Sequence, residues 1–179
     1  MAITSEDDFL RRVVGPDLSA RGFDVRYEMT FLLPTLDGGC QQRRADLYIT
    51  APPSWEHAGR WPAIAVEGKR RDGGSMGEEI DGLLQTRSCL YGYRFRIGST
   101  DYPRPSLALY VDQQTWAARG DEDTPRESML ADRLLWREGA AILFGPTRWR
   151  GPRFTFACVG SPQRSYLLPD LTEGARHAV

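Results

Sequence analysis

The sequence predicts an α/β protein in which helices flank a central mixed β-sheet. Segments with the two-residue period of strands alternate along the chain with segments of helical period, in the order helix, three strands, helix, strand, helix and two strands. The run from Pro62 to Val66 is apolar at every position and leads into the third strand. We expect residues 1–179 to form one domain, with a core over about residues 5–115 and a helix and hairpin over 125–160.

The first helix is predicted to begin at Thr4 or Ser5. A hydroxyl at the N-cap and acidic residues in the first turn stabilise a helix start, and residues 6–8 are all acidic. Apolar residues then recur at helical spacing. Gly15-Pro16 is expected to end or kink this helix, because proline cannot donate the next backbone hydrogen bond. A further turn is expected to stop at Gly22.

Three strands are predicted next. Residues 24–33 alternate in polarity as a strand does, and the sequence from Leu36 to Gly39 is typical of a tight turn. The second strand is expected over 43–50. A loop rich in proline, tryptophan and glycine separates it from the third strand at 61–69.

The second half of the chain continues the alternation. A glycine-rich connection over 70–77 precedes a helix at about 78–91, whose buried side is expected to carry Leu83, Leu84 and Tyr91. The remaining elements are expected to be a strand at 106–112, a helix at 125–138 and short strands at 140–144 and 154–159.

Composition restricts the class of protein. No apolar run approaches the roughly 20 residues of a membrane helix, and the acidic N-terminus is unlike a secretory signal, so we expect no membrane partner. The three cysteines, Cys40, Cys89 and Cys158, are odd in number and far apart, which fits reduced thiols in the cytoplasm. The formal net charge of −1 argues against a protein that coats nucleic acid, but it allows a local basic track beside an acidic metal site.

The residues that suggest chemistry lie on the second and third strands. Lys69 is the only lysine, whereas the other 22 of the 23 basic residues are arginines. Residues two apart in a strand share a face, so Glu67 and Lys69 are expected to point together while Gly68 points away. If the two strands pair, Asp46 can approach Glu67. Two such carboxylates can hold Mg²⁺, and a neighbouring ammonium can assist a water and balance charge on a phosphate.

The same residues also allow a plain structural interpretation, in which Asp46 ends a strand and Glu67 and Lys69 form a surface ion pair. In that case the match is accidental and Asp46 need not lie near Glu67. Three observations favour catalysis: the charged residues have apolar strand neighbours, a glycine-rich loop follows Lys69, and the next helix carries Gln85.

At this point the chain resembles a family. The pattern Asp46, Glu67-Gly68-Lys69 and Gln85 looks like the PD-(D/E)XK nuclease superfamily, with the restriction-endonuclease-like fold. It is most similar to the N-terminal nuclease domain of type I restriction enzyme motor subunits. The resemblance covers roughly residues 5–92, and its other features are Glu6, Pro16, Gly22, Glu28, Arg44-Ala45-Asp46, Ala65, Val66, Arg70 and Tyr91.

The resemblance implies a role for each matching residue. Asp46 and Glu67 would ligate Mg²⁺, for which Mn²⁺ can substitute, with help from the carbonyl of Gly68. Lys69 would serve the attacking water, and Gln85 would position the lysine or the substrate. A fifth residue, Glu6, would supply an outer acidic contact from the first helix.

Two departures from the family pattern bear on the biology. Ala45 stands where many members have proline, and 179 residues are too few for a helicase motor. We therefore expect a standalone nuclease, as a homodimer or with a separate partner subunit. The residues fit DNA or RNA, single- or double-stranded, cut internally or from an end. Our leading expectation is an Mg²⁺-dependent endonuclease acting on double-stranded DNA. The rival is a catalytically silent fold that serves as an interaction module.

Four arginines are candidates for nucleic-acid contact. Arg70 and Arg71 follow the third strand and could grip a phosphate beside the scissile bond. Arg148 and Arg150 flank an aromatic residue in the connection between the last two strands, where they could follow a nucleic-acid backbone. A solvated loop or a cation–π cluster would account for the same residues.

Overall fold

The computed structural model describes residues 3, 5–69, 76–117, 139–146, 151–156 and 164–170. The helical segments are α1 (Glu6–Phe9), a π-helical turn η1 (Leu10–Val14), α2 (Gly15–Ala20), α3 (Met76–Ser88) and α4 (Gln113–Ala117). The strands are β1 (Asp24–Pro34), β2 (Cys40–Thr50), β3 (Ala63–Lys69), β4 (Tyr93–Ile97), β5 (Thr100–Tyr102), β6 (Leu107–Asp112), β7 (Ala140–Phe144), β8 (Arg153–Phe156) and β9 (Arg164–Leu167). They form one nine-stranded sheet in the order β5-β4-β1-β2-β3-β6-β7-β8-β9. The pairs β3–β6 and β6–β7 are parallel and the others antiparallel, which confirms the predicted mixed α/β sheet.

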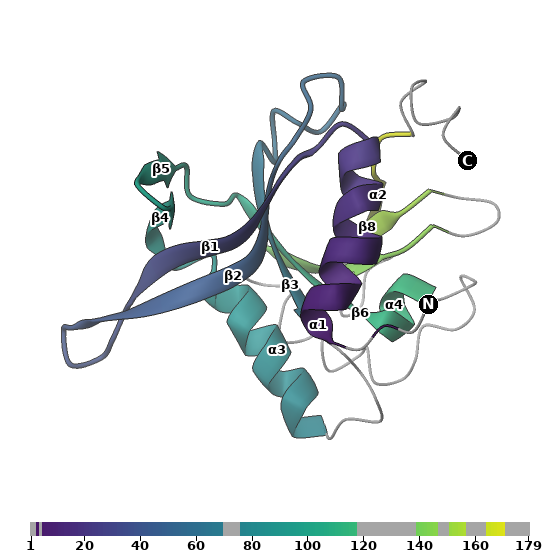
Figure 1. Cartoon of the computed structure of the whole chain (residues 1–179). Coiled ribbons are helices and arrows are strands. Elements are labelled where there is room, and N and C mark those ends of the chain that lie inside the picture. The colour runs from purple at the N-terminus through teal and green to yellow at the C-terminus, as the bar shows by residue number, and fades with distance from the viewer. Residues whose placement is uncertain are drawn as a thin grey trace.

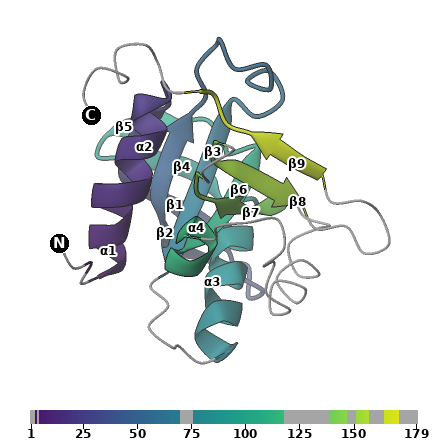
Figure 2. The same cartoon turned by 90° about the vertical axis from the view of Figure 1, so that its right-hand side faces the viewer.

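Each face of the sheet has its own hydrophobic core. The helical segments α1, η1 and α2 cover one face, and α3 covers the other (Figures 1 and 2). Ile64 and Val66 belong to the first core, under α1–α2, whereas Ala63 and Ala65 belong to the second, under α3. Strand β3 is therefore buried on both sides, which explains why its sequence is apolar without alternation.

The first helix begins as predicted but does not end at Gly15-Pro16. The Ser5 side chain accepts a hydrogen bond from the Asp8 N–H, at 3.0 Å, and caps the start. The helix then widens into η1, where the Gly15 N–H donates to the Leu10 carbonyl. Widening by one residue relieves the clash that a proline ring makes with the carbonyl four residues back, so the helix passes Pro16. It stops before Gly22, whose φ is 90°.

Halfway along the β1–β2 hairpin, the inward-pointing side chains of both strands switch from one hydrophobic core to the other. In β1, Tyr27 packs against the first core, but Met29, two residues later, belongs to the second. The residue between them, Glu28, has a φ of 60°, which costs a non-glycine residue about 1–3 kcal/mol. In β2 the same change falls between Ala45 and Leu47. The two strands keep their register across it, because Tyr27 pairs with Leu47 and Met29 with Ala45.

Other elements differ from the expectation. Strands β4, β5 and β9 and helix α4 were not predicted. Leu83 on α3 and Leu90, just after it, are buried as we expect from the sequence, but Leu84 on α3 and Tyr91 beyond it are 45% and 46% exposed. The helix expected over 125–138 lies outside the described residues. None of the helices in the described ranges has the length and apolar character needed to cross a membrane.

Candidate active site at the end of strand β3

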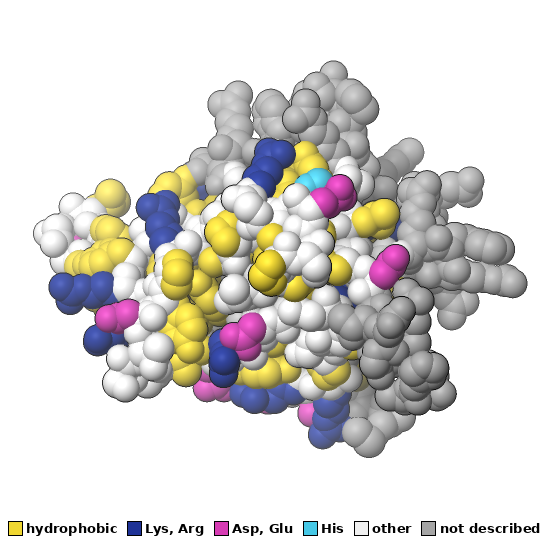
Figure 3. Space-filling model, turned by 90° about the horizontal axis from the view of Figure 1, so that it is seen from above, with side chains coloured by type: hydrophobic (Ala, Val, Ile, Leu, Met, Phe, Trp, Pro, Cys, Tyr) yellow, Lys and Arg dark blue, Asp and Glu magenta, His cyan; other side chains and the backbone are white. Residues whose placement is uncertain are grey.

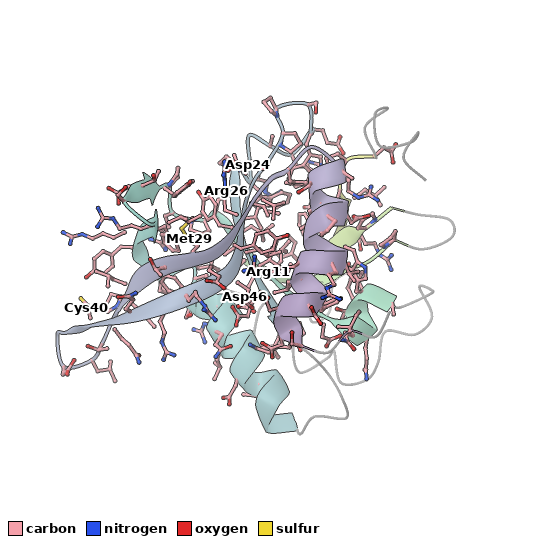
Figure 4. All side chains as sticks on the ribbon, in the orientation of Figure 1. Arg11, Asp24, Arg26, Met29, Cys40 and Asp46 are labelled. Carbon is pink, nitrogen blue, oxygen red and sulfur yellow. The ribbon has the colours of Figure 1, made fainter. Side chains whose placement is uncertain are left out.

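Asp46 lies where strands β2 and β3 separate. Their ladder ends with the pair Leu47 and Val66, and the next β2 residue is Asp46. Its Oδ2 accepts a hydrogen bond of 2.9 Å from the Gly68 N–H. The side chain of Asp46 thus accepts the hydrogen bond that a backbone carbonyl of β2 would accept if the two strands were still paired. Burial raises the pKa of Asp46, and the bond from Gly68 opposes that rise. Figure 4 shows Asp46 between the hairpin and the nearer ends of α1 and α3.

Glu67 is the most buried charged group of this site, with 4% of its surface exposed. Its Oε1 accepts a hydrogen bond of 3.0 Å from the Lys69 Nζ. Its Oε2 is buried and has no hydrogen-bond partner among the residues that the structure describes. Burial, followed by the charge of Asp46, raises the pKa of Glu67 to about 7. The two carboxylates thus interact, and one buried oxygen has capacity for another ligand.

Lys69 joins the acidic residues of three elements. Besides Glu67, its Nζ lies 3.6 Å from Glu6 Oε2 of α1, and 19% of its side chain is exposed. Burial alone would lower the pKa of Lys69, but Glu67, Glu6 and Asp46 together raise it above its ordinary value. The ammonium therefore stays charged at neutral pH. The structure brings Asp46, Glu67, Lys69 and Glu6 together, and Glu67 and Lys69 share a face as predicted.

The backbone of Gly68 also faces the site. Its N–H points to the β2 side, where it meets Asp46. The N–H and C=O of one strand residue point to the same edge, so the carbonyl of Gly68 also points toward β2, beyond the last ladder pair. This direction fits the sequence-based expectation that the carbonyl is a metal ligand.

The opposite side of Gly68 lies against the first helix. A Cβ there would come within 2.7–2.8 Å of three Leu10 side-chain atoms. We expect Gly68→Ala to destabilise the protein by about 1–3 kcal/mol through this overpacking. In urea unfolding, combining it with Leu10→Ala should cost less than the sum of the two single changes. Gly59→Ala, where a Cβ meets nothing within 4 Å, is the control. Additive costs would contradict the contact.

Helix α3 holds the stem of Lys69 through residues that the sequence did not single out. A Cβ on Gly82 would lie 2.8 Å from Lys69 Cγ and 3.0 Å from Tyr110 Cε2, so only glycine allows this approach. About two turns beyond Gly82 and directly after the last residue of α3, burial, then the charges of Glu67 and Asp46, raise the pKa of the Cys89 thiol. The seven-residue spacing of Gly82 and Cys89 was the available signal for this packed face.

The remaining predicted site residues are placed differently. Gln85 is exposed on α3, and its side chain makes no hydrogen bond within the ranges that the structure describes. The four arginines proposed for nucleic-acid contact lie outside the described residues; they are Arg70, Arg71, Arg148 and Arg150.

A pocket opens beside Asp46, on the α1 side of the hairpin. Its volume is about 340 Å³. The lining residues come from α1, the start of η1 and the hairpin, and they are Ser5, Glu6, Asp7, Leu10, Tyr27, Glu28, Arg44 and Asp46. Solvent can therefore reach Asp46 from this side.

The donor set of the site suits a hard cation. Among the described residues, no three His, Cys, Asp or Glu side chains are grouped so as to hold a metal ion. The site instead offers two carboxylates and a carbonyl, all oxygen donors. Mg²⁺ takes such partial sets, because it keeps several waters and binds through one or two carboxylates. The unpartnered Glu67 Oε2 fits this ion.

Comparison of the chain with models of known protein families, with curated proteins and with solved structures finds no match. Function is therefore inferred from the geometry of Asp46, Glu67 and Lys69.

Proposed function

We propose that this protein is an Mg²⁺-dependent nuclease that hydrolyses phosphodiester bonds in DNA, with internal attack as the expected mode. One observation carries the proposal. A buried carboxylate oxygen, Glu67 Oε2, has no hydrogen-bond partner within the described part of the chain and lies in a site that also contains Asp46. Leaving such an atom unsatisfied is costly, and a divalent cation would satisfy it and relieve the repulsion between the two carboxylates.

The roles of the side chains follow from their positions. Asp46, Glu67 and the Gly68 carbonyl would hold the cation. Mg²⁺, when bound, supplies a Lewis acid and lowers the pKa of water. Lys69 remains an ammonium, so it donates hydrogen bonds and balances the negative charge on the phosphate as water adds to phosphorus and a P–O bond breaks. Gly82 lets α3 pack on the lysine stem and fix its direction.

The resemblance to PD-(D/E)XK nucleases supports the same proposal through the order and spacing of Asp46, Glu67 and Lys69. The cytoplasm is the compartment we propose, because the described cysteines, Cys40 and Cys89, are free thiols. Cutting of double-stranded DNA would need two such sites, which a homodimer or a partner subunit could bring together.

Asp46→Asn tests the proposal. We expect the wild-type protein to nick or linearise supercoiled plasmid with Mg²⁺ or Mn²⁺ but not with EDTA. Asp46→Asn removes one of two anionic ligands, so calorimetry should show at least about tenfold weaker Mn²⁺ binding, and cleavage should fall by at least about a hundredfold. The matched control is Asp24→Asn, at the far end of the hairpin (Figure 4), where the carboxylate pairs with Arg26.

The outcomes separate the two candidate functions. Metal-dependent cutting that Asp46→Asn abolishes and Asp24→Asn retains would support the nuclease. A wild-type protein that neither cuts DNA nor binds Mn²⁺ would overturn it and favour a catalytically silent interaction module.

A further inference from the structure

The outer half of the β1–β2 hairpin projects from the body of the protein as an arm (Figure 1). We define the hairpin arm as Thr30–Pro34 of β1, the turn 35–39 and residues 40–44 of β2. Strand β2 pairs with β3 only from Leu47 to Thr50, so among the described residues no strand pairs with the outer edge of its arm portion, which we call the free edge. Every β2 residue from 40 to 44 is exposed. The turn is closed by backbone hydrogen bonds between Thr35 and Gly39 and between Gly38 and Thr35.

The free edge of the arm carries amide and guanidinium groups and no acid. Its residues after Cys40 are Gln41, Gln42, Arg43 and Arg44, and the facing segment Thr30–Pro34 is uncharged. The turn adds one acid, Asp37, so the arm as a whole has two arginines and one carboxylate, an excess of one positive charge in a chain whose net charge is −1. On the face drawn in Figure 3, by contrast, basic and acidic side chains are interspersed.

The arginines of the arm are available to a ligand. Arg43 makes no ion pair with any residue of the described ranges. Arg44 has only a long contact of 3.9 Å, from its Nη1 to Glu28 Oε2, and 60% of its side chain is exposed. Successive strand residues point to opposite faces, so the two guanidinium groups flank the free edge from both sides.

The arm leads directly to the candidate active site. Arg44 is two residues from Asp46 and lines the same pocket. The six steps from Cys40 to Asp46 extend about 20 Å in a strand, which matches about six base pairs of duplex. Figure 4 shows this path, with Cys40 near the tip and Asp46 at the base.

We propose that the hairpin arm docks on duplex DNA to one side of the cleavage point, with the free edge of β2 toward the duplex. Arg43 and Arg44 grip phosphates, and Gln41 and Gln42, nearer the tip, reach base edges in the major groove. That groove admits a two-stranded β-ribbon, and glutamine pairs with adenine there. The choice of nucleic acid rests on the proposed nuclease function, and the arm assigns double-stranded DNA as its substrate class.

The test is equilibrium binding of the full chain to a fluorescent 20-base-pair DNA duplex in EDTA, followed by anisotropy over a range of salt. The double variant Arg43→Ala/Arg44→Ala should bind at least about tenfold more weakly at 0.1 M salt, and the slope of log K against log salt should fall by about two. Gln41→Ala/Gln42→Ala should weaken binding with little change in that slope. Arg26→Ala, at the other end of β1, is the control and should bind as the wild-type protein does.

Several results would overturn the proposed docking of the arm on DNA. They are unchanged affinity in Arg43→Ala/Arg44→Ala, tighter wild-type binding to single-stranded DNA or duplex RNA than to duplex DNA, and equal losses in Arg26→Ala. Self-association of the arginine variant without a loss of DNA affinity would also overturn the proposal. Such a result would show that Arg43 and Arg44 keep the free edge of β2 from pairing with another copy of the chain.

Binding in EDTA separates this proposal from the nuclease. Duplex binding that depends on the arm, in a protein that never cuts DNA, would support docking and refute the nuclease. Metal-dependent cutting at the wild-type rate in Arg43→Ala/Arg44→Ala would support the nuclease and refute docking.

Discussion

Lys69→Ala is expected to slow DNA cleavage by about a thousandfold while Mn²⁺ binding is retained. The ammonium donates to Glu67, lies 3.6 Å from Glu6 and stays charged because these acids raise its pKa. Its removal takes away a preorganised charge that stabilises the transition state, for which losses of this size are typical. It also removes a positive charge that repels the cation, so calorimetry should show Mn²⁺ affinity at or above the wild-type level.

Lys69→Arg separates charge from shape. Gly82 and Tyr110 leave little space around the lysine stem, so the larger guanidinium should restore only a small part of the lost rate, measured as initial nicking of supercoiled plasmid. Full activity in Lys69→Ala would contradict a role in the reaction. Loss of Mn²⁺ binding together with activity would assign Lys69 to the integrity of the site instead.

Glu67→Gln is expected to stabilise the metal-free protein above pH 7 by about 2–3 kcal/mol. Glu67 has a pKa of about 7 in the folded state against an ordinary value of 4.5. Between these values the folded protein binds more protons than the unfolded chain, so the free energy of unfolding falls as the pH rises from 4.5 to 7. A neutral amide avoids this loss, although part of the gain is offset because Lys69 loses its nearest carboxylate.

Urea unfolding in EDTA at pH 5 and pH 8 measures this effect. The difference between wild type and Glu67→Gln should be small at pH 5 and large at pH 8, and Mn²⁺ should stabilise only the wild type at pH 8. Glu56→Gln is the matched control, because the Glu56 side chain is 77% exposed. The same difference at both pH values would show that Glu67 titrates as an ordinary carboxylate.

The parts of the fold that the sequence predicted have strong local signals. The alternation in β1, the apolar run in β3 and the acidic start of α1 each indicate an element within a few residues. Strands β4 and β5 lack such signals, because only Phe95 of β4 is buried and β5 has three residues. The sequence predicted a further turn after Pro16 and its stop at Gly22, but not the π-helical turn that accommodates the proline, because that widening has no local sequence signal.

In the site, too, the sequence predicted one part, the convergence of the side chains, and could not predict the other, their environment. The convergence of Asp46, Glu67 and Lys69 follows from the two-residue period and from strand pairing, both of which the sequence indicates. Their environment does not, because the burial of Glu67 depends on how α3 packs. Gly82 acts through the absence of a side chain, and its spacing from Cys89 indicates a packed helix face but not the contact with Lys69.

The strained backbone of Glu28 lies where the hairpin side chains switch from one core to the other, and this position has a consequence for how the arm could act on the site. Glu28 and Asp46 lie on facing strands, at the point where the arm joins the body of the protein. A duplex that displaces the arm would rotate the hairpin at Glu28 and so move Asp46 toward or away from Glu67. Contacts that the arm makes with DNA about 20 Å away would then set the alignment of Asp46, the proposed metal ligand, with the reacting bond. In the proposed nuclease, cutting would then depend on engagement of DNA by the arm.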